Sequence, residues 1–123
     1  MRSRLYGIVP LMTSLAQANL ESLGLKDLDG TISAFCLRWR ISRFSFFGSI
    51  LREDFGPGSD VDVLVDFLEH EKPSLLQFAQ MQAELESLFH RKVDLLDHSG
   101  VEQSRNPYRR QEILATAEIA HAG

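Results

Sequence analysis

The stretch FFGSILREDFGPGSDVDVLV, residues 46–65, joins an apolar run, a glycine turn and paired carboxylates. Seven Asp and Glu residues lie between residues 53 and 71, and no Lys or Arg lies among them. Like charges this close in sequence repel one another. The carboxylates are therefore either the solvated end of a strand or a group held together by a cation and hydrogen-bond donors.

Two predicted strands flank the glycine turn. Residues 41–47, ISRFSFF, are rich in β-branched and aromatic side chains and end at Gly48. Residues 61–67, VDVLVDF, are almost continuously apolar, which predicts burial on both faces of a sheet. Gly48-Ser49 begins a turn or a short helix. The segment VDLLD, residues 93–97, is a third strand that could lie beside the second.

Two helices are expected before these strands, each with apolar residues at helical spacing. The first covers residues 11–23, ends at Gly24 and has its apolar stripe at Leu11, Leu15, Ala18 and Leu23. The second is capped by Asp29 or Thr31 and buries Ile32, Phe35, Cys36 and Trp39.

Two further helices are expected after the second strand. One has Pro73 in its first turn, continues to His90 and buries Leu75, Phe78, Met81, Leu85 and Leu88. The other starts at Asn106-Pro107 and carries Ile113, Leu114 and Ala117. Alternating helices and strands predict an α/β (α+β) fold, in which helices cover a small sheet. We expect one compact unit, with residues 1–30 as a helical extension of a domain over residues 31–123.

Composition excludes several classes of protein. The 123 residues are 44% hydrophobic and carry a net charge of −4, so disorder and non-specific nucleic-acid binding are not expected. Apolar runs shorter than a membrane span predict a cytoplasmic protein without membrane contact. The single cysteine, Cys36, is predicted to be a buried thiol.

The paired carboxylates predict a metal site. Asp60 and Asp62 project from the same face of a strand, about 7 Å apart along it. A divalent ion such as Mg²⁺, which binds one or two carboxylates together with substrate phosphate oxygens, relieves their repulsion. Asp94, on the third strand, could supply another ligand. Gly48 lets backbone N–H groups approach an anion, and the Ser49 hydroxyl adds a donor, so the turn predicts a phosphate cradle beside the metal.

The pattern Gly48-Ser49, ten residues, then Asp60-x-Asp62 resembles the signature of the polymerase-β-like nucleotidyltransferase superfamily. The fuller stretch is similar to its smallest members, the minimal nucleotidyltransferase antitoxins encoded with HEPN-domain ribonuclease toxins. The resemblance covers residues 31–120 and implies a mixed sheet.

In this family the glycine and serine hold the nucleotide phosphates, and the paired aspartates bind Mg²⁺. Asp94 matches the third carboxylate, which binds a second metal ion or activates the attacking hydroxyl, although Asp97 lies close by. Arg52 matches an arginine that would neutralise phosphate, or it forms an exposed ion pair with Glu53 or Asp54.

The implied reaction transfers AMP from ATP to a tyrosine hydroxyl of the HEPN toxin, with release of pyrophosphate. Two alternatives stay open. One is an antitoxin that blocks its toxin by binding alone, and the other is a nucleotidyltransferase that acts on a small molecule.

Overall fold

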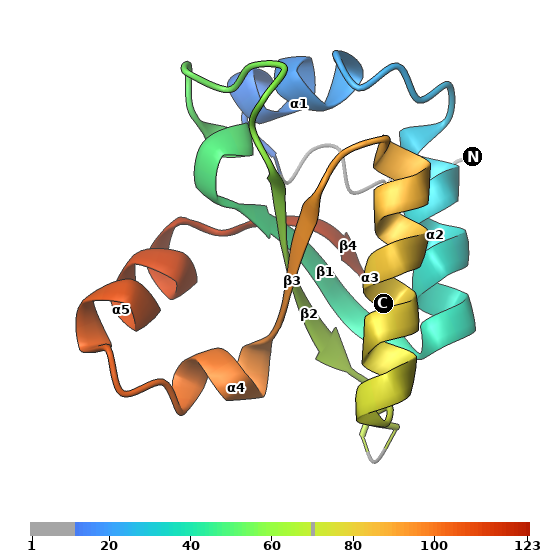
Figure 1. Ribbon diagram of the computed structural model, residues 1–123, viewed down its shortest axis with the longest axis vertical. Coiled ribbons are helices and arrows are strands. Elements are labelled where there is room, and N and C mark those ends of the chain that lie inside the picture. The colour runs from blue at the N-terminus through green and yellow to red at the C-terminus, as the bar shows by residue number, and fades with distance from the viewer. Residues whose placement is uncertain (1–11, 70) are drawn as a thin grey trace.

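The computed structural model describes residues 12–69 and 71–123 and contains a mixed four-stranded sheet (Figure 1). The strands are β1 (Ile41–Phe47), β2 (Val61–Phe67), β3 (Val93–Asp97) and β4 (Glu118–Ala122), in the order β3-β2-β1-β4. β1 is antiparallel to both of its neighbours, whereas β2 and β3 are parallel. The predicted mixed sheet and the first three strands are confirmed.

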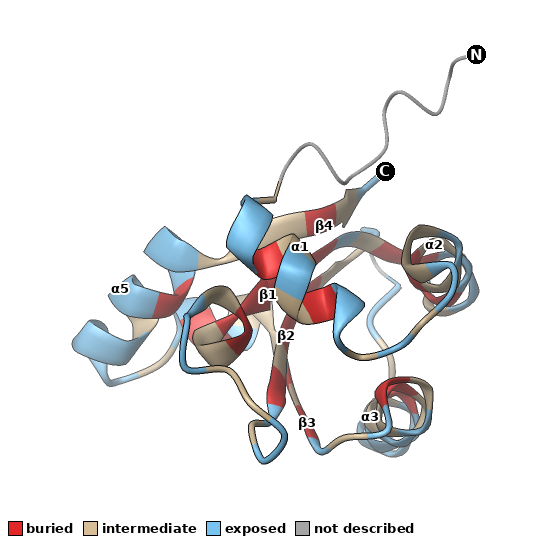
Figure 2. Cartoon of the chain, turned by 90° about the horizontal axis from the view of Figure 1, so that it is seen from above, coloured by how far each residue is buried: buried red, intermediate tan, exposed pale blue. Residues whose placement is uncertain are grey.

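Helices lie on both faces of the sheet. They are α1 (Ser14–Glu21), α2 (Leu28–Trp39), α3 (Leu75–Phe89), α4 (His98–Glu102) and α5 (Pro107–Thr116), together with a 3₁₀ turn, η3 (Gly48–Leu51). α2 and α3 lie side by side against one face, and α4 and α5 lie on the other (Figures 1 and 2). The short helix expected at Gly48-Ser49 is η3.

The large core lies between the sheet and the helices α2 and α3. Alternate residues of each strand point into it, because side chains of a strand alternate between faces. Its buried members include Phe35, Phe44, Phe46, Val61, Val63, Met81, Leu85, Phe89, Val93 and Leu95. Cys36 belongs to the same core, which confirms the predicted buried thiol, and burial raises the pKa of this thiol to about 12.

A much smaller apolar cluster lies on the opposite face. It consists of Phe47, Leu64, Val101 and Ile113, with Leu96 and Ala117 against it. These residues come from the other alternate positions of β1, β2 and β3 and from α4 and α5. In Figure 2 the buried segments lie mainly along the sheet and the inner sides of α2 and α3, while α5 is largely exposed.

The helix starts correct two of our predictions and confirm a third. Asp27 caps α2 by accepting a hydrogen bond from the Gly30 N–H, so neither Asp29 nor Thr31 is the cap. α3 begins after Ser74, whose reciprocal hydrogen bonds with Gln77 form a capping box, so Pro73 lies before the helix. α5 starts as predicted, with Asn106 as cap and Pro107 in the first turn.

Two predicted apolar stripes are partly wrong. In α1 the buried residues are Ala16 and Leu20, and Leu15 is exposed; Leu11 lies outside the described residues. In α3, Leu75 is 87% exposed because it occupies the first turn, beyond the end of the core, and Phe89 is buried instead. Helical spacing therefore located these helices but not all of their buried residues.

Two elements were absent from the prediction. α4 follows β3 directly, and β4 pairs antiparallel with the outer side of β1. The expected division at residue 30 falls inside α2, and Leu20 of α1 packs into the large core. In residues 12–69 and 71–123, no helix is long and apolar enough to cross a membrane.

Candidate functional site

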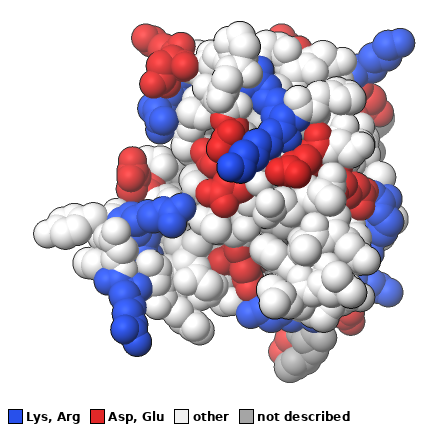
Figure 3. Space-filling view, viewed as in Figure 1, with Lys and Arg blue, Asp and Glu red and all other residues white. Residues whose placement is uncertain are grey.

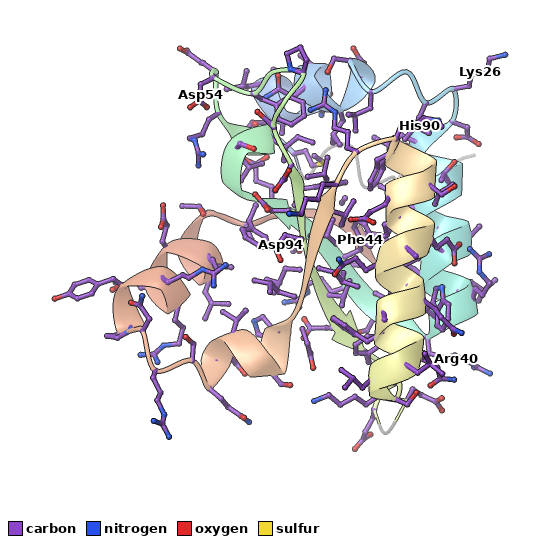
Figure 4. All side chains as sticks on the ribbon, viewed as in Figure 1. Lys26, Arg40, Phe44, Asp54, His90 and Asp94 are labelled. Carbon is purple, nitrogen blue, oxygen red and sulfur yellow. The ribbon has the colours of Figure 1, made fainter. Side chains whose placement is uncertain are left out.

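Two carboxylates face each other on the side of the sheet that carries the smaller apolar cluster. Asp62 of β2 and Asp94 of β3 are direct partners in the parallel register, so their side chains leave neighbouring strands on the same face. Figure 4 shows Asp94 beside β3, on the side where α5 lies. Burial, and next the charge of Asp94, raise the pKa of Asp62 to about 6, while a hydrogen bond from the Ser49 backbone opposes this shift.

Gly48 makes room for this carboxylate. Its φ of 74° lies in the left-handed region, which side chains disfavour. A Cβ atom at this position would collide with Oδ2 of Asp62. The turn therefore requires glycine for its backbone conformation and also for the close approach of Asp62.

Asp60 lies two residues before Asp62, at the end of the loop that joins η3 to β2. Its side chain is exposed, and its carbonyl accepts a hydrogen bond of 3.2 Å from the Ser49 hydroxyl. The preceding loop is held by Arg91, whose Nη1 donates to the carbonyls of Gly56 and Ser59 at 2.7 and 2.8 Å. The loop geometry thus brings Gly48-Ser49 and Asp60 to one end of the sheet.

A cleft of about 530 Å³ opens beside the turn. Its lining comes from β1, η3, α5 and β4, and comprises Phe47, Gly48, Leu51, Arg52, Arg109, Glu112, Ile113, Thr116 and Glu118. The floor is apolar, whereas the rim carries both basic and acidic groups. Figure 3 shows carboxylates near the middle of this view, with one basic side chain between them and others to their left.

Two arginines lie on the rim of this cleft. Arg52 forms an exposed ion pair with Asp54 at 3.4 Å, one of the two partners expected for it, and it also lowers the pKa of Asp62. Arg109 of α5 lies 3.9 Å from Oδ2 of Asp94. Both guanidinium groups are about half exposed, so they can reach an anion that enters from solvent.

Asp97 has a different environment from Asp94. It ends β3, caps α4 by accepting hydrogen bonds from the Ser99 N–H and hydroxyl, and pairs with Lys72 at 3.0 Å. In the sheet register it lies opposite Val65, not opposite Asp62. The geometry therefore favours Asp94 over Asp97 as the partner of Asp62.

The donor set fits a hard cation that shares its ligands with a substrate. Within the described ranges, no three His, Cys, Asp or Glu side chains are arranged to hold a metal ion by themselves. Asp62 and Asp94 nevertheless offer carboxylate oxygens side by side, and their mutual repulsion is of the kind that a divalent cation relieves. Mg²⁺ commonly takes one or two protein carboxylates and completes its shell with phosphate oxygens and water.

Known proteins with similar sequences and structures identify the class of protein to which this chain belongs. Residues 28–119 match the family described as the nucleotidyltransferase domain, and the chain belongs to that family. A solved structure described as a minimal nucleotidyltransferase superposes with a TM-score of 0.59 and 31% identity, covering 80% of this chain and 92% of the other. The predicted resemblance to minimal nucleotidyltransferases and their fold is confirmed.

Two further matches have more specific names. The protein adenylyltransferase MntA of Thermococcus cleftensis is 41% identical over 64 residues, which cover 52% of this chain and 63% of that protein. This match spans less than two thirds of the MntA chain. A chain from a toxin–antitoxin complex with AMP-PNP superposes with a TM-score of 0.60 at 16% identity, covering 76% of this chain and 73% of the other. At that identity the likeness shows a shared fold.

Three residues in or beside the site were not predicted from the sequence. Arg109 lies in a basic segment, but its position opposite Asp94 depends on how α5 folds back over the sheet. Arg91 and Asn19 both bind backbone carbonyls of the η3–β2 region. For them the sequence held no signal, because each contact joins residues more than 30 positions apart.

Proposed function

We propose that this chain is an antitoxin that transfers AMP from ATP to a tyrosine hydroxyl of a HEPN-domain ribonuclease toxin. The observation that carries the proposal is the pairing of Asp62 with Asp94 directly beside the Gly48-Ser49 turn. A binding surface alone would not need like charges in register next to a backbone anion site.

The donor nucleotide would lie across the turn and the cleft. The N–H groups and hydroxyl of Gly48-Ser49 would bind its phosphates, and Arg52 and Arg109 on the rim would neutralise their charge. Asp62 and Asp94 would hold Mg²⁺ together with phosphate oxygens, and Asp60 would complete the ligand set once the metal and the nucleotide are bound. The ion would stabilise charge on the phosphate oxygens. ATP as donor is supported by the name of the Thermococcus relative and by the AMP-PNP in the toxin–antitoxin complex.

In the proposed step, the tyrosine oxygen attacks the α-phosphorus of ATP. The new bond joins this oxygen to phosphorus, and the bond from the α-phosphorus to the oxygen bridging to the β-phosphate breaks. Pyrophosphate leaves with the electron pair, and the hydroxyl proton passes to Asp94 or to solvent. This chain's own contribution is to position both reactants and to stabilise charge.

A partner protein suits a site this open. Asp60 and the side chains of Arg52 and Arg109 are accessible, so a hydroxyl carried by another protein could reach the carboxylates. We place the reaction in the cytoplasm, where ATP is available, and we assign no direct nucleic-acid binding to a chain of net charge −4.

Intact-mass spectrometry tests this proposal directly. A HEPN-domain toxin, the proposed partner, would be incubated with ATP, Mg²⁺ and either the wild-type chain or the Asp62→Asn variant. We expect a mass gain of AMP units that requires the metal and is lost in the variant. Glu53→Gln is the matched control, since it removes an exposed carboxylate of the same loop region without touching the site.

The negative outcome is also informative. If a stable complex forms and the ribonuclease is inhibited without any mass gain, the chain is an antitoxin that acts by binding, and the transfer reaction is wrong. If only small hydroxyl compounds such as aminoglycosides gain AMP, the protein acceptor is wrong.

A further inference from the structure

One side chain outside the matched family region reaches the phosphate-binding turn. Nδ2 of Asn19, in α1, donates hydrogen bonds to the carbonyl oxygens of Ile50 and Arg52 at 2.8 and 3.0 Å. These carbonyls belong to the last part of η3 and the residue after it. Asn19 lies before residue 28, where the family match begins.

The end of a short helical turn needs such a donor. The last carbonyls of a helix have no partners within it, and η3 has only four residues. A closing hydrogen bond of 2.9 Å runs from the Arg52 N–H to the Ser49 carbonyl, and the Arg52 carbonyl also accepts from the Phe55 N–H at 3.4 Å. An amide group has two N–H donors and can therefore hold two neighbouring carbonyls at once.

Other groups of the same turn belong to the candidate site. The Ser49 backbone bonds the Asp62 carboxylate, and the Arg52 side chain lines the cleft. Because η3 is so short, a shift of its carbonyls would also shift the Ser49 N–H and the Arg52 side chain. Asn19 thus holds backbone carbonyls of the turn that also carries the Ser49 N–H and the Arg52 side chain.

α1 is itself fixed firmly enough to serve as a support. Ala16 and Leu20 are buried, and Leu20 belongs to the large core. The Thr13 hydroxyl caps the helix by accepting from the Ala16 N–H, and the Thr13 N–H donates to Oε1 of Glu118 at 2.8 Å. Figure 1 shows α1 alongside η3 at one end of the sheet.

From these contacts we infer that Asn19 is a positioning residue for the nucleotide: through the carbonyls of Ile50 and Arg52 it holds the phosphate-binding turn in its binding conformation. This inference rests on the proposed function, in which the cleft beside Gly48 takes a nucleoside triphosphate. The inference gives α1 a role in nucleotide binding, although α1 lies outside the Gly48-Ser49 and Asp60-x-Asp62 motif.

The test measures binding of a non-hydrolysable ATP analogue with Mg²⁺ by calorimetry. Asn19→Ala removes both donors, and Asn19→Asp keeps the side-chain size but has no N–H to donate at neutral pH. We expect each variant to bind the analogue about tenfold more weakly, the scale of one or two lost hydrogen bonds. Asn19→Gln retains the donors and should recover most of the affinity.

Thr13→Ala is the matched control. It removes the N-cap of the same helix and destabilises α1, but it leaves the Asn19 amide in place. We expect it to bind the analogue within about twofold of wild type, even if its melting temperature falls as far as that of Asn19→Ala. In the same variants, amide hydrogen exchange of residues 48–52 should be faster for Asn19→Ala and unchanged for Thr13→Ala.

The possible failures are distinguishable. If wild type does not bind the analogue, both the proposed function and this inference are wrong. If wild type binds it and Asn19→Ala binds equally well, or Thr13→Ala weakens binding to the same degree, Asn19 has no positioning role and the proposed function stands. Should Asn19→Ala not fold, Asn19→Asp and Asn19→Gln decide the question, because they differ in the donor while keeping a side chain of similar size.

Discussion

The two faces of the sheet use the same strands for different purposes. On one face, alternate residues such as Phe46, Val63 and Leu95 pack against α2 and α3 and are almost fully buried. On the other, Asp62 and Asp94 occupy the intervening positions, and only a small apolar cluster covers the strands. Along each strand, residues that stabilise the fold therefore alternate with residues available for chemistry. Burial on the packed face contributes the free energy that offsets the repulsion between Asp62 and Asp94 on the other face.

The largest expected effect comes from breaking the packed face. Phe46→Ala should lower the free energy of unfolding by about 4 kcal/mol, since Phe46 is fully buried against Phe44 and Phe89. Phe47→Ala, on the next residue but the other face, should cost about 2 kcal/mol, because its cluster is small and borders the cleft. Urea denaturation of both variants measures the difference. Equal losses would show that the two faces contribute alike.

The second prediction concerns Gly48, in the turn that follows β1. Gly48→Ala should cost about 2 kcal/mol, since it combines a left-handed backbone with a clash against Asp62, and it should abolish nucleotide binding. Gly58→Ala is the control, because an added Cβ there has no atom within 4 Å. Its stability should change by less than about 1 kcal/mol. A Gly48→Ala protein that binds an ATP analogue normally would remove the argument for a close backbone approach.

The third prediction concerns the effect of the Asp62 carboxylate on stability at different pH values. The folded-state pKa of Asp62 is about 6, above its ordinary value of 3.8, so the folded state binds more protons between these values. Stability should therefore fall as pH rises from about 4 to 6. Asp62→Asn removes this loss and should be more stable than wild type by about 1 kcal/mol at pH 7 without metal, a value reduced for the partial exposure of the carboxylate.

Thermal unfolding across pH provides the measurement. The advantage of Asp62→Asn should vanish below about pH 4, where the wild-type carboxylate is protonated in both states. Adding Mg²⁺ with an ATP analogue should raise the melting temperature of wild type more than that of the variant, and a chelator should reverse the gain. A variant that is less stable than wild type at pH 7 would contradict the unfavourable burial of the Asp62 charge and its repulsion by Asp94.

The smallest effect on stability is expected at the rim of the site. Arg52→Ala should change the free energy of unfolding by less than about 0.5 kcal/mol, because its ion pair with Asp54 is exposed. It should nonetheless weaken binding of a triphosphate about tenfold, measured by calorimetry, since it removes a cation from the cleft. Arg105→Ala removes an exposed arginine outside the cleft and should leave that affinity unchanged.

Much of the packed face could be predicted from the sequence. The strands 41–47, 61–67 and 93–97 are rich in β-branched, aromatic and other apolar residues and lie near glycines, and these local features predict strands. β4 could not be predicted, because its five residues include Glu118 and His121, and its strand conformation depends on pairing with β1. Leu75 was assigned to the core because helical spacing does not show where the core ends.

The candidate site was predictable only as a set of residues. Spacing identified Gly48, Ser49, Asp60 and Asp62, but the choice between Asp94 and Asp97 needed the register of β2 and β3. The hydrogen bonds of Asn19 join α1 to a turn far along the chain, and no local pattern encodes them. The sequence therefore identifies the residues of a motif. The residues that hold the motif in place, such as Asn19, can be identified only from the tertiary structure.

The position of β4 also affects the order in which the protein can form during synthesis. One edge of β1 can pair as soon as β2 has been synthesised. The other edge pairs with β4, so it stays unpaired until the ribosome has added the residues from Phe47 to Glu118. At roughly 5–20 residues per second this takes several seconds. During that interval the edge of β1 is open to pairing with other chains, and neither the cleft nor the contact from Thr13 to Glu118 is complete. The cleft beside Gly48 would therefore be among the last parts of the molecule to form.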